Sequence, residues 1–229
     1  MTASYPAFEP RLEILPPAQR WPWSRLGTFS TQGFVLYGGT AIALRLGHRS
    51  SEDFDFFTDK QLDKAAIRNA LPSAHYEVLQ DIENTYTLLI NGPVSEEAAV
   101  KLSCFGGLTF GRFGQPTIAA ASQVAVASLD DLLATTLAAV LLRVEAKDYR
   151  DLAALLRAGL SLARGLAIAS EMYGPQFPAA QCVKTLTYFK GGDLAELPDV
   201  DRTTLRSASA AVDGLPQVSR LSSTLGIAP

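Results

Sequence analysis

The segment YGGTAIALRLGHRSSEDFDFF, residues 37–57, constrains the fold more than any other part of this sequence. Its glycine pair follows a short apolar run and predicts a tight turn, where the missing side chains let the backbone approach another group closely. Residues 40–46 predict a short helix. Residues 52–57 alternate acidic and aromatic side chains, which is typical of a half-buried β-strand. The segment therefore predicts a strand–turn–helix unit followed by a second strand.

The second strand of this segment carries two carboxylates. Because side chains alternate along a strand, Asp53 and Asp55 share one face, with Cα atoms about 7 Å apart, while Phe54 and Phe56 point into the core. Phosphoryl and nucleotidyl transfer require a divalent metal held by closely placed carboxylates. The pair therefore predicts a metal site for Mg²⁺ or Mn²⁺. The alternative is that the two acids are the solvent face of an exposed strand.

The residues around the glycine pair suit a phosphate group. The backbone N–H groups of Gly38, Gly39 and Thr40 lie at the start of the predicted helix, where the positive end of the helix dipole favours an anion. Arg49 and Ser51 precede the predicted strand and supply a cation and a hydroxyl. We therefore expect these five residues to bind the phosphates of a nucleotide. A glycine pair on its own is also a common turn.

A second set of polar residues lies far along the chain. Thr136, Arg143, Lys147 and Asp151 are spaced so that one continuous helix would align them on a single stripe. The functional interpretation places Lys147 and Arg143 on the nucleotide phosphates, with Asp151 as an orienting residue or a catalytic base. The plain alternative is a surface ion pair worth about 0.3–0.5 kcal/mol.

The periodicity along the chain predicts an α/β (α+β) protein with a mixed sheet flanked by helices and an all-α C-terminal part. We expect a proline-rich extended arm over residues 1–26, pinned by its tryptophans, a core over 27–127 and a helical domain over 128–229. The expected strands are 34–37, 52–57, 76–80, 85–90, 100–105 and 124–127. The expected helices, besides 40–46, are 59–70, 129–143, a continuation or neighbour over 146–156, and then 161–172, 179–189 and 201–212.

Composition narrows the class of protein. The net charge of -3 argues against a broad nucleic-acid-binding surface. The two cysteines, Cys104 and Cys182, are far apart and favour free thiols in a reducing compartment. We expect a cytoplasmic protein with no membrane contact, because the chain has neither an apolar run long enough to span a bilayer nor a signal-peptide pattern.

The two motifs together resemble the AbiEii/AbiGii-type nucleotidyltransferase family, within the polymerase-beta-like superfamily. The residues that carry the resemblance are the glycine pair, the segment Arg49-Ser50-Ser51-Glu52-Asp53-Phe54-Asp55 and, later, Lys147-Asp148-Tyr149-Arg150-Asp151-Leu152 preceded by Arg143. The resemblance implies Mg²⁺ on Asp53 and Asp55 and a nucleoside triphosphate near the glycines. It also implies transfer to a hydroxyl acceptor, left open among an RNA end, a protein and a small molecule. Members include toxins, whose partner is an antitoxin protein.

Two departures from this pattern keep a second interpretation open. Ser103 stands where a third carboxylate is expected, and a serine does not take up a proton near neutral pH. Thr136 stands where relatives often have a lysine. The alternative is therefore a catalytically silent relative that binds a nucleotide or a protein.

Other enzyme classes fit the sequence poorly. Thr58 follows the second aspartate one residue too late for a haloacid-dehalogenase motif, and no lysine follows the glycines as in a Walker loop. His48 and His75 lack the partners of a zinc site. No serine or cysteine lies in a nucleophile elbow.

Overall fold

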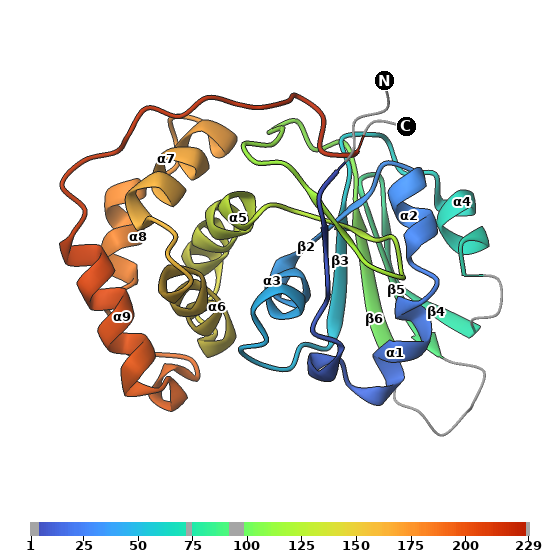
Figure 1. The fold of residues 1–229 in the computed structure, drawn as a ribbon, viewed down its shortest axis with the longest axis horizontal. Helices are drawn as coiled ribbons and strands as arrows, with labels where there is room; N and C mark the ends of the chain where they lie inside the picture. Colours follow the sequence, from blue (N-terminus) through green and yellow to red (C-terminus); the bar gives the residue numbers. More distant parts are fainter. Residues whose placement is uncertain (1–4, 72–74, 92–98, 228–229) are drawn as a thin grey trace.

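A computed structural model describes residues 5–71, 75–91 and 99–227 of the chain, so residues 1–4 of the expected arm lie outside it. The predicted class is confirmed. Figure 1 shows a mixed sheet with helices on both faces and a separate group of helices formed by the later part of the chain.

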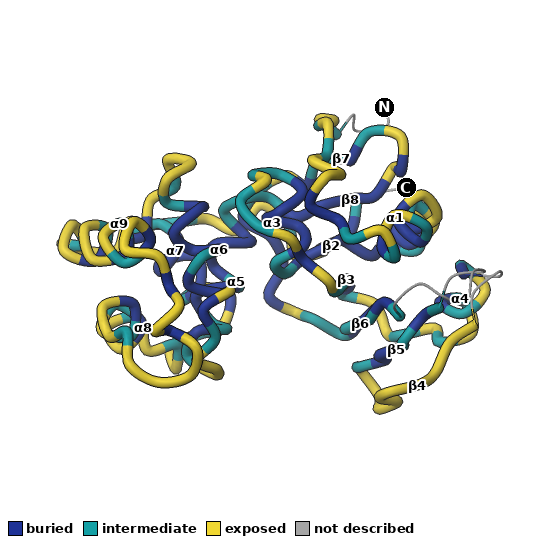
Figure 2. Tube along the Cα trace, turned by 90° about the horizontal axis from the view of Figure 1, so that it is seen from below, coloured by how far each residue is buried: buried dark blue, intermediate teal, exposed yellow. Residues whose placement is uncertain are grey.

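The described residues form one eight-stranded sheet in the order β1-β7-β8-β2-β3-β6-β5-β4. Its central strand β3 pairs antiparallel with β2 and parallel with β6. The edge strand β4 is exposed along its whole length (Figure 2). The strands are β1 (Ala7–Phe8), β2 (Val35–Tyr37), β3 (Asp53–Phe57), β4 (His75–Ile82), β5 (Thr85–Asn91), β6 (Val100–Phe105), β7 (Thr117–Ala119) and β8 (Ala125–Val126).

Helices cover the sheet unequally. Helix α3 lies on the face turned toward the later helices, whereas α1, α2 and α4 lie on the other side (Figure 1). The helices are α1 (Pro17–Trp23), α2 (Gly27–Thr31), α3 (Gly38–Leu46), α4 (Lys64–Asn69), α5 (Leu129–Leu142), α6 (Ala146–Arg157), α7 (Leu162–Tyr173), α8 (Ala179–Thr185) and α9 (Asp199–Ala210), with short 3₁₀ turns η1 (Leu12–Ile14) and η2 (Leu194–Glu196).

The aromatic residues of β3 anchor the core beneath the sheet. Phe54 stacks on Trp23 with ring centroids 6.1 Å apart, and Phe56 stacks on Phe29 at 4.7 Å. All four side chains are buried. The predicted alternation of this strand is therefore confirmed, because Phe54 and Phe56 face the core and Asp53 and Asp55 face the opposite side.

The expectation of an extended N-terminal arm is wrong for much of its length. Residues 17–23 form α1, which begins with Pro17 at its first position, where a proline removes no helical hydrogen bond. Helix α2 follows after a short turn. The tryptophan contact does hold this segment in place, because Trp23 lies in the core.

The expectation of one continuous helix through residues 136–151 is also wrong. Helix α5 ends at Leu142, Arg143 has an extended backbone at φ -147° and ψ 153°, and α6 begins at Ala146. No glycine or proline marks this break. Two other predicted helices, 59–70 and 179–189, are shorter in the structure, as α4 and α8.

The last described residues return to the sheet. After α9 the chain runs back over the molecule (Figure 1). The Arg112 guanidinium donates to the carbonyls of Thr224 at 3.0 Å and Gly226 at 2.6 Å. Leu225 is buried beside them. Within the described ranges, no helix has the length and apolar character needed to cross a membrane.

Candidate active site

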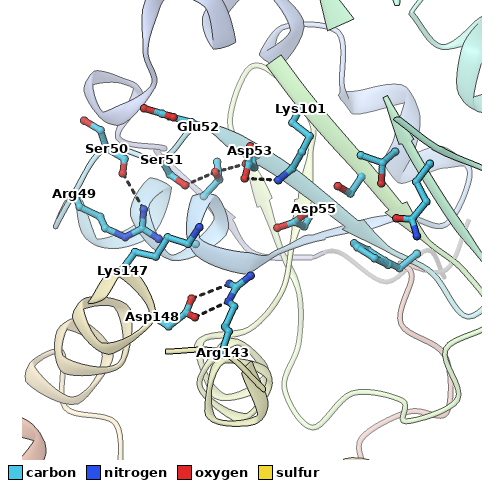
Figure 3. Close-up of a pocket in the computed structure, with 16 residues that line it drawn as sticks. Arg49, Ser50, Ser51, Glu52, Asp53, Asp55, Lys101, Arg143, Lys147 and Asp148 are labelled. Carbon is cyan, nitrogen blue, oxygen red and sulfur yellow. Dashed lines mark hydrogen bonds and ion pairs between the residues drawn. The ribbon is translucent and has the colours of Figure 1, made fainter. Parts of the chain in front are cut away.

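The two aspartates of β3 line a cavity of about 550 Å³ between the sheet and the later helices. Figure 3 shows Asp53 and Asp55 on the strand side and Arg143 and Lys147 on the helical side. Four basic and four acidic side chains line the cavity: Arg49, Lys101, Arg143 and Lys147 with Glu52, Asp53, Asp55 and Asp148. The structure therefore brings the two motifs of the sequence together at one cavity.

The glycine pair lies directly beside these side chains. Gly38 has φ +72°, and a Cβ there would lie 2.7 Å from the Asp55 carboxylate. A Cβ on Gly39 would collide with the Arg49 guanidinium and lie 3.0 Å from the Asp151 carboxylate. Glycine is needed at Gly38 for its backbone conformation and at both positions for space.

Strand β6 places two further polar side chains beside the aspartates. In the parallel register Lys101 lies next to Asp53 and Ser103 next to Asp55. Lys101 Nζ is 2.8 Å from Asp53 Oδ2. Lys101 was not among the predicted site residues, although an i, i+2 spacing on a strand puts it on one face with Ser103.

Burial makes Asp55 harder to ionise than an ordinary aspartate. Its pKa is raised, first by burial and then by repulsion from Asp53, while Lys101 and a hydrogen bond with Ser103 lower it. Ser103 therefore contacts the carboxylate and stabilises its charged form.

The break between α5 and α6 turns two cations toward the cavity. Arg143 forms a fork with the Asp148 carboxylate, at 2.7 and 2.9 Å, and this hydrogen bonding raises the pKa of Arg143. Lys147 Nζ is 2.8 Å from Glu145. Asp148 lies in the first turn of α6, where a carboxylate is favourable, so its contact with Arg143 links that turn to the end of α5.

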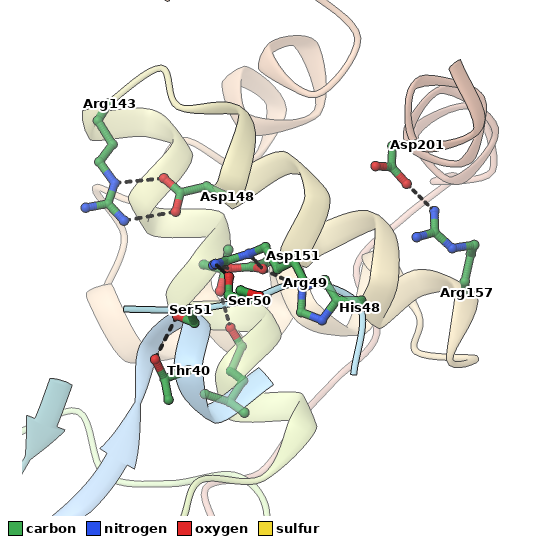
Figure 4. A network of polar contacts seen from close by, with 12 residues as sticks. Thr40, His48, Arg49, Ser50, Ser51, Arg143, Asp148, Asp151, Arg157 and Asp201 are labelled. Atoms are coloured by element: carbon green, nitrogen blue, oxygen red, sulfur yellow. Dashed lines mark hydrogen bonds and ion pairs between the residues drawn. The ribbon is translucent and has the colours of Figure 1, made fainter. Parts of the chain in front are cut away.

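Asp151 lies behind the cavity and not in its lining. Its side chain is 2% exposed and accepts from Arg49 Nε at 2.6 Å and from Arg49 Nη2 at 2.7 Å (Figure 4). His48 Nε2 is 2.6 Å from the same carboxylate. Arg49 itself lines the cavity. Asp151 therefore binds Arg49 on the side away from the cavity. Lys147 is paired with Glu145 and not with Asp151.

The three predicted hydroxyl residues fall into two groups. Thr40 and Ser51 line the cavity and are buried, and the Ser51 hydroxyl donates to Thr40 Oγ1 over 2.7 Å, because the single Thr40 proton is used toward the Asp53 carbonyl. Thr40 also donates to the Asp53 carbonyl. Thr136 lies within α5, outside the cavity lining, and donates to Leu132 of the same helix.

Asp53 and Asp55 are the two acids that one strand places together at the cavity. Among the residues that the structure describes, no group of three or more His, Cys, Asp or Glu side chains could hold a metal ion. The free thiols expected from the sequence are present, because Cys104 and Cys182 are both unpaired and buried.

The eight-stranded mixed sheet, with two aspartates of one strand beside a glycine turn, has a nucleotidyltransferase-type fold. Residues 27–209 match the family described as "Nucleotidyl transferase AbiEii toxin, Type IV TA system". The chain belongs to this AbiEii nucleotidyltransferase toxin family, which confirms the resemblance inferred from the two motifs.

The individual relatives match the chain over a short segment or at low sequence identity. The uncharacterized protein aq_aa25 of Aquifex aeolicus (strain VF5) is 39% identical over 62 residues, which cover 26% of this chain and 30% of that protein. A crystal structure from H. pylori, described as a candidate nucleotidyltransferase, has a TM-score of 0.58 at 19% identity, over 84% of this chain and 91% of that one. MenT4, a nucleotidyltransferase toxin from Mycobacterium tuberculosis H37Rv, has a TM-score of 0.56 at 16% identity, over 83% and 81%. At these identities the two structures show the shared fold.

Proposed function

We propose that this chain transfers a nucleoside monophosphate from a nucleoside triphosphate to a hydroxyl acceptor, with Mg²⁺ or Mn²⁺ held by Asp53 and Asp55. The observation that carries the proposal is the cavity in which these two carboxylates face the cations Arg143 and Lys147. The acceptor oxygen would bond to the α-phosphorus, the bond from that phosphorus to the oxygen that bridges to the β-phosphate would break, and the hydroxyl proton would pass to water. Pyrophosphate is the leaving group.

The donor set suits a hard divalent cation. Asp53 and Asp55 supply carboxylate oxygens from one strand face, and the position of Lys101 Nζ against Asp53 indicates that a positive charge is favourable there. The metal, when bound, would neutralise phosphate charge and orient the triphosphate. Ser103 would help to keep Asp55 ionised through its hydrogen bond.

The cations of the cavity would bind the phosphate oxygens. Lys147 and Arg143 reach the cavity from the helical side, and Arg49 reaches it from the loop before β3. The first backbone N–H groups of α3, around Gly39 and Thr40, add positive potential at the same place. Asp151 would act as a positioning residue, because its carboxylate holds Arg49 and is buried away from the cavity lining.

A second candidate function is nucleotide binding without transfer. The observation that favours it is Ser103, which contacts Asp55 at the position where an acid could have accepted the proton of the attacking hydroxyl. An antitoxin protein would be a partner of the chain under either function, given its toxin family.

A labelling assay separates the two functions. The protein is incubated with α-labelled nucleoside triphosphates, Mg²⁺ or Mn²⁺, and total RNA and protein, beside Asp55→Ala. The proposal expects metal-dependent label in an acceptor and none with Asp55→Ala. Persistent transfer by Asp55→Ala would overturn the assignment of the site. Tight, metal-dependent nucleotide binding with no transfer would favour the second function.

A further inference from the structure

A smaller cavity lies beside His48, which contacts the Asp151 carboxylate, and is separate from the cavity that Asp53 and Asp55 line, here called the catalytic cavity. It measures about 340 Å³ and lies between α6 and the start of α9. Its lining residues are His48, Arg150, Arg157, Pro198, Val200 and Asp201. It shares no lining residue with the catalytic cavity.

Two arginines from one face of α6 give this cavity its charge. Arg150 and Arg157 are seven residues apart, or about two helical turns, so they project in nearly the same direction. Arg157 contacts Asp201 through Nη1, which offsets that buried acid (Figure 4). Arg150 makes no hydrogen bond or ion pair with any residue in the described part of the chain, and its Nε is buried. The cavity therefore contains one uncompensated guanidinium.

His48 contributes a second nitrogen without a partner. Its side chain is 9% exposed, and its Nε2 is engaged with Asp151 at 2.6 Å. Its other ring nitrogen, Nδ1, is buried and has no hydrogen-bond partner among the described residues. Buried polar atoms of folded proteins are nearly always hydrogen-bonded, so the Arg150 Nε–H indicates a place for an acceptor. Because Nε2–H donates to the Asp151 carboxylate, Nδ1 is a second donor to this place when the imidazole is protonated.

The start of α9 faces the same cavity. Pro198 is its N-cap, and the backbone bonds of its first turn begin with the N–H of Asp201, which donates to the Pro198 carbonyl at 3.0 Å. The N–H of Val200, one residue earlier, has no intrahelical acceptor, as in the first turn of any helix. The helix dipole adds positive potential at this end.

We propose that this cavity binds a phosphate group. A phosphate offers several acceptor oxygens, which match the guanidinium of Arg150, the Nδ1–H of a protonated His48 and the α9 N-terminus. The source would be either free phosphate or the backbone of a nucleic acid strand. The inference does not depend on the transfer reaction. It does place the ligand next to catalytic residues, because His48 and Arg49 hold the same Asp151 carboxylate.

Histidine NMR provides a direct test, because the chain has only two histidines. Inorganic phosphate is titrated into the protein at constant pH and ionic strength while the imidazole signals of His48 are followed, with the exposed His75 as an internal control. A saturable shift of the His48 signals is expected. Arg150→Gln should raise the phosphate Kd about tenfold, the effect of losing one hydrogen bond to a charged group.

The matched control is Lys147→Gln on the same helix, which removes a cation from the catalytic cavity only. It should leave the His48 response within about twofold of the parent. Arg150→Lys keeps the positive charge but loses the paired N–H donors of the guanidinium. The phosphate Kd of this variant should therefore lie between those of the parent and Arg150→Gln. Equal Kd values for the parent and Arg150→Gln, or a His48 signal that does not move, would overturn the proposal.

A second titration with a short single-stranded RNA distinguishes the two sources. A saturable His48 shift with this RNA, lost in Arg150→Gln, would assign the site to a strand backbone. A shift with inorganic phosphate alone would assign it to free phosphate. No His48 response to either probe would mean that the cavity is not a phosphate site. None of these results requires label transfer, so they remain separate from the test of the transferase.

Discussion

The buried pair of Asp151 and Arg49 should contribute strongly to the stability of this protein. The carboxylate is 2% exposed and the guanidinium 14%, and two hydrogen bonds of 2.6 and 2.7 Å join them. Asp151→Asn keeps the shape but removes the charge, and its amide nitrogen would face the Arg49 or His48 donors. Removing one partner of a buried pair costs about 3–5 kcal/mol. We expect the lower end, about 3 kcal/mol, because one acceptor oxygen remains.

A double-mutant cycle measures this contribution directly. Urea unfolding is compared for the parent, Asp151→Asn, Arg49→Met and the double variant. Each single variant should lose about 3 kcal/mol, which for a chain of this size lowers Tm by about 6–12 °C. The double variant should lose much less than the sum of the two, because Arg49→Met relieves the donors left unpaired by Asp151→Asn. The coupling energy should be about 2 kcal/mol or more.

Two outcomes would refute this reasoning. The first is a single Asp151→Asn variant within about 0.5 kcal/mol of the parent, which would show that the pair is not effectively desolvated. The second is additive losses, which would show that Asp151 and Arg49 act independently. Either outcome would also remove the basis for treating Asp151 as the residue that positions Arg49 in the catalytic cavity.

Two further changes have outcomes set by local geometry. Gly38→Ala forces a side chain into φ +72° against the Asp55 carboxylate, so it should lose about 1–3 kcal/mol in urea unfolding and abolish label transfer. The control Gly214→Ala, where a Cβ meets nothing within 4 Å, should change stability by less than about 0.5 kcal/mol. Burial raises the pKa of Asp131 to about 6 from 3.8, so the native state binds its proton more tightly than the unfolded state. This stabilisation, roughly 3 kcal/mol, is present below pH 4 and is lost as the pH rises through 6. The free energy of unfolding of Asp131→Asn should therefore depend less on pH between 4 and 7 than that of the parent. An equal pH dependence in the two proteins would contradict this prediction.

The strands near the site could be predicted because their pattern is local. The predicted strand 52–57 corresponds to β3, and the predicted strand 100–105 matches β6. Period-two alternation between aromatic and acidic residues reports which face of the strand is buried, whatever its partners are. The same reasoning could have found Lys101, which lies two residues from Ser103 on the face that bears the aspartates.

The break between α5 and α6 could not be predicted in this way. The apolar stripe through Leu137, Val140 and Val144 continues across it, so helical periodicity alone favours one long helix. The break coincides with the fork of Arg143 on Asp148, a contact whose strength depends on the surrounding structure. Tertiary interactions of this kind override a local helical preference that is worth only tenths of a kcal/mol per residue.

Contacts between segments that are distant in the sequence could not be predicted either. The pairing of β1 with β7, and the return of the last residues to Arg112, join parts of the chain separated by about a hundred residues. Short strands such as β1 carry too few residues for alternation to be recognised. Helix α1 was not predicted because prolines at this density argue against a long helix, whereas α1 has only seven residues and Pro17 occupies its first position, which tolerates proline.

The glycine pair shows how one sequence pattern can have a different physical cause from the one first inferred. From the sequence, the missing Cβ atoms were expected to leave room for phosphate. In the structure, the space beside Gly38 is occupied by Asp55, and the space beside Gly39 by Arg49 and Asp151. Helix α3 can therefore start against β3 and α6 only because both positions lack a side chain. The pair is required by the protein's own charged residues before any nucleotide binds, so its substitution should disturb stability and transfer together.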